Sequence, residues 1–154
     1  ADALLGILAQ RLARRLCTGC RQAYHPDQEE VGALLAEYCE DLRGTASFRD
    51  DPDSARARIL DGWKTRHADK SGRFTLYRPV GCEECNKGYR GRIGLHELML
   101  GTEQVKRLLV EHSRVSALLG AALEDGMLTL RMDGIEKVLA GHTDIKMVRA
   151  VCIR

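Results

Sequence analysis

The 154-residue sequence has no long apolar run, few aromatic residues and little excess of charge of either sign. No run approaches the roughly 20 apolar residues that span a bilayer, so we expect no transmembrane helix. The 24 Lys and Arg residues nearly balance the 22 Asp and Glu residues, which weakens the long-range field expected of a nucleic-acid binder. The first residues lack the basic leader of a signal peptide. We therefore expect a cytoplasmic, reducing setting and no nucleic-acid partner.

The sequence also lacks the glycine-rich loop with which many nucleotide-hydrolysing motors hold phosphate. No Gly-x-x-x-x-Gly-Lys-Ser/Thr pattern occurs in it. Such a loop supplies the amides and the ammonium group that surround the phosphates, and the hydroxyl that helps to hold magnesium. The glycines from Gly88 to Gly94 are the nearest imitation, but no Lys-Ser or Lys-Thr pair closes them. We expect no ATP hydrolysis by this chain alone.

Cysteine is present in a pattern that predicts a metal site. The two motifs Cys17-x-x-Cys20 and Cys82-x-x-Cys85 can each present two sulfurs to one ion. Four thiolates with no open position are typical of structural zinc, and they leave no place for a catalytic water. The motifs are 61 residues apart. Doubling a loop costs only about 0.6 kcal/mol, which is small beside the ~10 kcal/mol that zinc can contribute to folding.

Other interpretations of the cysteines stay open at this point. Iron in a four-sulfur setting is the main rival metal. A dithiol redox protein is a second alternative, although such a protein usually carries its motif at the start of a helix that follows a strand. A stand-alone zinc-ribbon-like nucleic-acid-binding domain is a third. Cys39 and Cys152 are interpreted as small apolar residues, and His25 as a surface histidine.

The hydrophobic pattern predicts an α+β fold that is mainly α. Leu4, Leu8, Leu12 and Leu16 recur at helical spacing, which favours a helix over residues 3–16 that begins at or before residue 1. Residues 31–72 are interpreted as a helical insertion with a loop at residues 43–53. Residues 73–80 and 92–98 are expected to form a small antiparallel hairpin at the zinc site, and residues 101–154 a C-terminal helical bundle.

Several longer motifs resemble the tetracysteine region of the GspE/PilB family, the ATPases of type II secretion and type IV pilus assembly. They are the run from Ala9 into Cys17-x-x-Cys20, the run from Tyr77 into Cys82-x-x-Cys85, and the run from Gly88 to Leu98. The order of glycines and polar residues from Gly126 to Thr143 extends the match. The insertion at residues 31–72 is longer than the family spacing.

The resemblance implies a part of a hexameric motor at the inner face of the bacterial inner membrane. Its partners would be the rest of the parent ATPase, neighbouring subunits and inner-membrane secretion or pilus-assembly proteins. Residues 1–16 would be a terminal helix that continues from an ATPase core, and residues 17–100 a zinc-binding subdomain. The chain itself would be a structural and interaction module rather than an enzyme.

Overall fold

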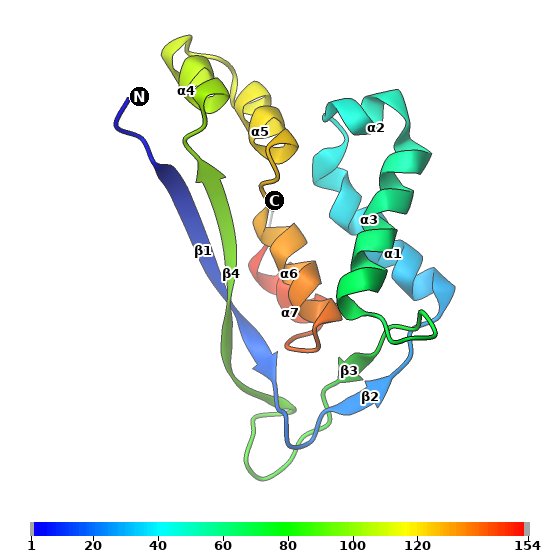
Figure 1. Cartoon of the computed structure of the whole chain (residues 1–154). Helices are drawn as coiled ribbons and strands as arrows, with labels where there is room; N and C mark the ends of the chain where they lie inside the picture. Colours follow the sequence, from blue (N-terminus) through cyan, green and yellow to red (C-terminus); the bar gives the residue numbers. More distant parts are fainter. Residues whose placement is uncertain (1, 153–154) are drawn as a thin grey trace.

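A long antiparallel ribbon of two strands forms one side of the molecule (Figure 1). The computed structural model describes residues 2–152. Strand β1 (Gly6–Leu16) pairs with β4 (Tyr89–Leu100) in an unbroken register from Gly6 opposite Leu100 to Arg14 opposite Arg92. A shift follows, so that Leu16 lies opposite Tyr89. The ribbon thus joins two segments that are far apart in the sequence.

The prediction of a helix over residues 3–16 is wrong, because the described part of this segment contains β1. Residue 1 lies outside the described residues. The leucines at positions 8, 12 and 16 are four residues apart, and a spacing of four fits both a helical turn and two periods of a strand. The leucine pattern alone is compatible with a helix or a strand, and the pairing with β4 selects the strand.

A second, shorter sheet lies next to the cysteine motifs. Its strands are β2 (Gln22–Tyr24) and β3 (Leu76–Arg78), which pair antiparallel. Residues 73–80 and 92–98 were expected to pair with each other, but β3 pairs with β2 and β4 pairs with β1. Both strand positions were thus predicted, and both partners were missed, because β2 is only three residues long and β1 was interpreted as a helix.

Four helices follow β4 and pack along the ribbon, as expected for the C-terminal bundle. They are α4 (Glu103–Val110), α5 (Val115–Glu124), α6 (Leu130–Leu139) and α7 (Ile145–Val151). Helix α6 contacts β4 and α7 contacts β1. Gly134 of α6 permits this packing, since a Cβ atom there would lie 2.5 Å from Val148 Cγ1 and 3.2 Å from Leu95 Cδ1.

The segment at residues 31–72, interpreted as an insertion and so named below, is helical, as predicted. It contains α1 (Gln28–Cys39), a short 3₁₀-helix (Glu40–Leu42), α2 (Ala46–Asp50) and α3 (Pro52–His67). The loop expected over residues 43–53 is largely helical, which corrects that interpretation. Its Asp and Pro residues start a helix: Asp51 caps α3 by accepting a hydrogen bond from the Ser54 amide, and Pro52 occupies the first turn.

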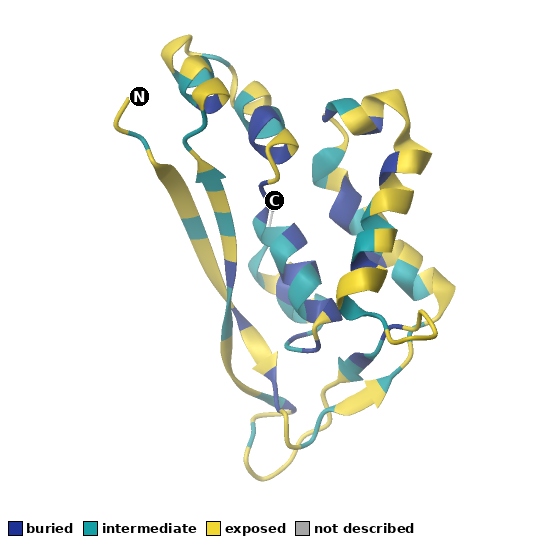
Figure 2. Ribbon diagram, viewed as in Figure 1, coloured by how far each residue is buried: buried dark blue, intermediate teal, exposed yellow. Residues whose placement is uncertain are grey.

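The insertion packs firmly against the C-terminal helices rather than projecting from them. Trp63 is fully buried and meets Tyr38 edge-to-face, with ring centroids 5.2 Å apart. Three ion pairs join the insertion to α6 and α7: Arg66 with Glu136, Arg131 with Glu40, and Arg149 with Glu37. Figure 2 shows the buried residues where the helices face one another. The insertion therefore belongs to the same core as α6.

The observed architecture confirms the fold class, mainly α with a small antiparallel sheet component beside the cysteines. Among residues 2–152, no helix has the length and apolarity needed to cross a membrane. The division into a zinc-binding subdomain at residues 17–100 and a bundle from residue 101 stays a prediction.

Candidate metal centre

The four predicted cysteines meet at the end of the ribbon. Cys17 follows β1 directly, Cys20 closes the first turn, and Cys82 and Cys85 lie in the connection between β3 and β4. All four Sγ atoms lie within 4.8 Å of one another. The Sγ–Sγ distances are 3.9 Å for Cys17 with Cys82, 3.7 Å for Cys20 with Cys85, and 3.6 Å within the second motif.

These distances fit one tetrahedral ion better than disulfides. A zinc ion with four bonds of about 2.3 Å places neighbouring sulfurs about 3.8 Å apart, whereas a disulfide needs about 2.05 Å. The residues present could therefore hold a zinc ion with four sulfur ligands. Such a set would be closed, because it leaves no coordination position for water or substrate.

Backbone amides also point at the sulfurs. The Gly81 amide donates to Cys20 Sγ at 3.3 Å, and the Cys82 amide donates to Cys85 Sγ at 3.2 Å. The two motifs are linked by the Cys17 amide, which donates to the Gly88 carbonyl at 2.9 Å. Hydrogen bonds from amides stabilise thiolates, so each turn is shaped to hold negative charge on sulfur.

Gly88 closes the second turn with a backbone conformation that disfavours any side chain. Its φ is +99°, and a Cβ atom there would lie 2.5 Å from Pro79 Cβ and 2.9 Å from the Val80 nitrogen. The chain before the second motif and the chain after it therefore touch at Gly88. This contact sets Cys82 and Cys85 against the first motif.

The thiols perturb one another strongly. Burial acts to raise the pKa of Cys85, but the amides of Cys82 and Gly88 outweigh it and lower this pKa to about 7. The Glu84 amide acts to lower the pKa of Cys82, yet the hydrogen bond with Cys85 and burial raise it to about 12. Four sulfurs this close cannot all ionise without a cation, which is the condition that a bound metal satisfies.

The link between α6 and α7 holds the cysteine turns from the other side. Arg21 stacks on the Tyr77 ring at 3.9 Å and donates to the Gly141 carbonyl at 2.6 Å. Tyr89 donates to the Asp144 carboxylate at 2.5 Å. The Leu16 amide donates to the carbonyl of residue 142 at 2.9 Å. The cysteine turns are thus connected to the helical core.

The sequence pattern picked out the four cysteines that meet here but missed these supporting residues. Arg21 directly follows Cys20, and Tyr89 follows the second motif. This closeness to the motifs in the sequence was the only signal that could have identified them as supporting residues. The pairing with residues 141–144 is a tertiary contact that no local pattern predicts. Cys39 is buried, as the apolar interpretation expected, and lies outside the sulfur cluster. His25 is exposed and contacts the Phe74 carbonyl at 2.9 Å.

Comparison with known proteins matches this chain to proteins of secretion and pilus assembly. A family model described as type II/IV secretion system protein matches residues 1–150. The type II secretion system protein E of Dickeya dadantii is 37% identical over 144 residues, which cover 93% of this chain and 22% of that protein. The type IV pilus assembly ATPase PilB of Pseudomonas aeruginosa is 30% identical over 145 residues, which cover 94% of this chain and 20% of that protein.

A further relative is the type IV pilus assembly ATPase PilB of Thermus thermophilus. It is 31% identical over 149 residues, which cover 96% of this chain and 13% of that protein. The chain therefore spans 22% or less of the length of these three relatives. The resemblance drawn from the cysteine motifs is confirmed.

Proposed function

The chain belongs to the family of type II/IV secretion system proteins, and on that premise we propose that it is a zinc-binding structural and interaction module of a secretion or pilus-assembly ATPase. The observation that carries the proposal is the meeting of Cys17, Cys20, Cys82 and Cys85 at Sγ–Sγ contacts of 3.6–3.9 Å. Zinc would join the end of β1 to the turn before β4. It would thereby set the ribbon against the α6–α7 link.

The chain would contribute structure rather than catalysis. Four thiolates leave no open position at the ion, so the metal would not activate water. No phosphate-binding loop occurs in the sequence, and so nucleotide hydrolysis would belong to other parts of a longer protein. The names of two relatives include ATPase. In such a motor this chain would work in a hexamer at the inner face of the inner membrane.

Its partners would be the rest of the parent ATPase, neighbouring subunits and inner-membrane assembly proteins. The formal net charge of +2 and the low aromatic content argue against nucleic acid. The insertion would widen the surface that the module presents, because α1 and α3 add to the core formed with α6. The ion pairs across that contact would keep the surface rigid.

Metal analysis of the chain purified without added metal tests the proposal. We expect about one zinc per chain, because the four sulfurs form one closed tetrahedral set. The matched control is Cys39→Ala, which removes a thiol outside the cluster and should keep the metal. A spectrum typical of iron bound to four sulfurs would identify the metal as iron rather than zinc. The absence of any metal together with accessible low-pKa thiols would favour the dithiol redox alternative.

Two further measurements separate the remaining alternatives. ATP turnover by the chain should equal that of a buffer blank. Hydrolysis that disappears on mutation of Cys82 would turn the site into a catalytic one and overturn the proposal. Tight nucleic-acid binding that weakens steeply with salt would favour the nucleic-acid-binding alternative.

A further inference from the structure

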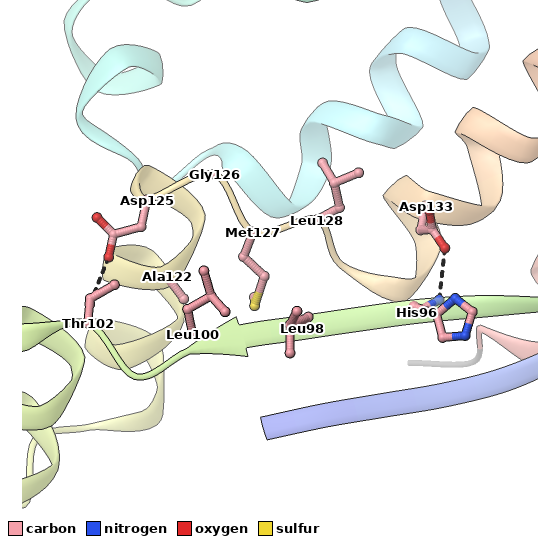
Figure 3. Close-up of a pocket in the computed structure, with 10 residues that line it drawn as sticks. All are labelled: His96, Leu98, Leu100, Thr102, Ala122, Asp125, Gly126, Met127, Leu128 and Asp133. Atoms are coloured by element: carbon pink, nitrogen blue, oxygen red, sulfur yellow. Dashed lines mark hydrogen bonds between the residues drawn. The ribbon is translucent and has the colours of Figure 1, made fainter. Parts of the chain in front are cut away.

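An apolar groove runs beside the outer edge of β4 (Figure 3). It has a volume of about 300 Å³. Leu98 and Leu100 of β4 form its floor and are 47% and 57% exposed. Ala122, Met127 and Leu128, at the end of α5 and in the link to α6, form its other wall. The groove lies far along the ribbon from the cysteines.

The backbone along this groove is an open strand edge. The His96 amide donates to Asp133 Oδ2 at 2.8 Å, so it points away from β1. The register with β1 is unbroken here, and the amides of alternate residues in an antiparallel strand point the same way. The Leu98 and Leu100 amides therefore also point outward. Within residues 2–152, no acceptor from another element reaches either of them.

The carbonyl groups complete the edge. The Leu100 carbonyl accepts from the Thr102 amide at 2.9 Å, which ends the open stretch. The Leu98 amide, the Leu98 carbonyl and the Leu100 amide remain available along the groove. An open edge of this kind is a template for pairing with another strand. A short segment of about three residues would satisfy these groups.

The charge of the groove indicates what kind of segment fits. Asp133 is neutralised by Lys137, whose Nζ lies 2.6 Å from Oδ2. Asp125, at the Leu100 end, accepts from the Thr102 hydroxyl at 3.0 Å, and no cation within residues 2–152 pairs with it. The charge that remains uncompensated in the groove is thus negative. A basic side chain is its complement.

We propose that the β4 edge binds an extended peptide segment of a partner protein by strand addition. The segment has apolar side chains at alternate positions, which pack on Leu98, Leu100 and Met127, and a Lys or Arg beside Asp125. Main-chain hydrogen bonds supply affinity in this mode, and the apolar groove and the carboxylate supply specificity. The inference deepens the proposed role as an interaction module and rests on it, but binding uses none of the cysteines.

The opposite edge of the ribbon provides a matched control. Leu8 lies directly opposite Leu98, so its amide points outward from the β1 edge. Proline is tolerated on an edge strand where the missing N–H would have faced outward. Leu98→Pro thus removes a donor on the groove side, and Leu8→Pro makes the same change on the other side.

The test uses fluorescein-labelled hexapeptides in which valine and threonine alternate. One set of these peptides ends in arginine and the other set ends in glutamate. Fluorescence anisotropy on the zinc-loaded chain should show saturable binding and a preference for the arginine peptides. Leu98→Pro should weaken binding about tenfold or more, since a hydrogen bond and packing are both lost. Leu8→Pro should leave it unchanged, and Asp125→Asn should remove the arginine preference.

A peptide methylated at its backbone nitrogens tests the same contact without altering the protein, and it should not bind. Zinc content and thermal melting of each variant show whether the fold persists, so loss of metal and loss of peptide binding are distinguishable failures. The proposal is overturned by the absence of saturable binding to any peptide, or by loss of binding in Leu8→Pro but not Leu98→Pro. It is also overturned if sedimentation shows that Leu98→Pro abolishes self-association, which would make a second copy the occupant.

Discussion

The cysteine junction and the helical body of this molecule are stabilised by different kinds of interaction. At the junction only Cys17 of the four ligand candidates is buried, and the sheet beside it has strands of three residues. Hydrogen bonds from amides to sulfur, the Arg21 guanidinium stacked on the Tyr77 ring and single hydrogen bonds connect its parts. In the helical body Trp63, Ile135 and Val148 are completely buried.

This difference indicates which part of the chain a bound metal would stabilise most. The turns that carry Cys20, Cys82 and Cys85 are mostly exposed, so the apolar area that they bury would not by itself offset the backbone entropy of ordering them. The helices bury a continuous apolar cluster that reaches from α3 across α6 to Leu95 of β4. The helices should keep their secondary structure when no metal is bound to the cysteines. Four substitutions test whether the two regions really fail separately.

Cys17→Ser should produce the largest effect, because it removes a ligand from a site whose metal can contribute about 10 kcal/mol to folding. We expect zinc content to fall from about one per chain to nearly zero. The pairing between β2 and β3 should loosen. The far-UV circular dichroism spectrum should keep most of its helical signal. Elemental analysis and circular dichroism on the same sample measure both quantities.

Complete loss of the helical signal in Cys17→Ser would contradict the separation of the two regions, since the helices would then need the metal. Retention of one zinc per chain would contradict the ligand assignment instead. Cys39→Ala is the control for removing a buried thiol without touching the cluster.

Trp63→Ala should have the next largest effect, which is a loss of stability in the helical body. It removes a ring that is 0% exposed and its edge-to-face contact with Tyr38. Truncating a buried aromatic residue lowers the free energy of unfolding by about 3–5 kcal/mol. Denaturant unfolding should show this loss while zinc content stays unchanged. Loss of zinc in this variant would mean that the insertion holds the cysteines in place.

The same division explains what the sequence could predict. The spacing of Cys17, Cys20, Cys82 and Cys85 identified the cluster, because ligand chemistry constrains local spacing. The apolar faces of α1 and α3 identified the insertion as helical. The strand at residues 6–16 was missed, because its partner β4 lies more than 70 residues away and its leucine spacing fits both periods. The contacts of Arg21 and Asp144 with the junction are tertiary, and no local pattern encodes them.

Gly88→Ala should have a smaller effect, centred on the junction. The new Cβ atom would lie 2.5 Å from Pro79 Cβ, and the φ of +99° disfavours any side chain. We expect a loss of about 1–3 kcal/mol from backbone strain and faster release of zinc to a chelator. Gly120→Ala is the matched control: nothing lies within 4 Å of its Cβ position in α5, so stability should rise slightly. Equal rates of zinc release to the chelator in both variants would show that Gly88 does not set the turn.

Glu136→Gln should have the smallest effect of the four, and it should depend on pH. Burial acts to raise the pKa of the Glu136 carboxyl, but hydrogen bonds from Arg66 and His67 outweigh it and hold this pKa below its ordinary value of 4.5. The carboxylate side chain is 15% exposed, whereas Arg66 is 50% exposed and screened by solvent. We therefore expect a loss of only about 1–2 kcal/mol near neutral pH.

A carboxyl whose folded pKa is lowered stabilises the fold above its unfolded pKa, and the contribution is lost as the pH falls through the folded pKa. The difference in unfolding free energy between the native chain and Glu136→Gln should thus be constant near neutrality and shrink below about pH 4.5. Because any loss of bound metal in acid would affect both chains alike, the difference between them isolates the ion pair. Glu40→Gln is the control: its side chain is 51% exposed, so its pairing with Arg131 should contribute less than about 1 kcal/mol. A difference for Glu136→Gln that persists in acid would show that packing of the side chain, and not its charge, joins the insertion to α6.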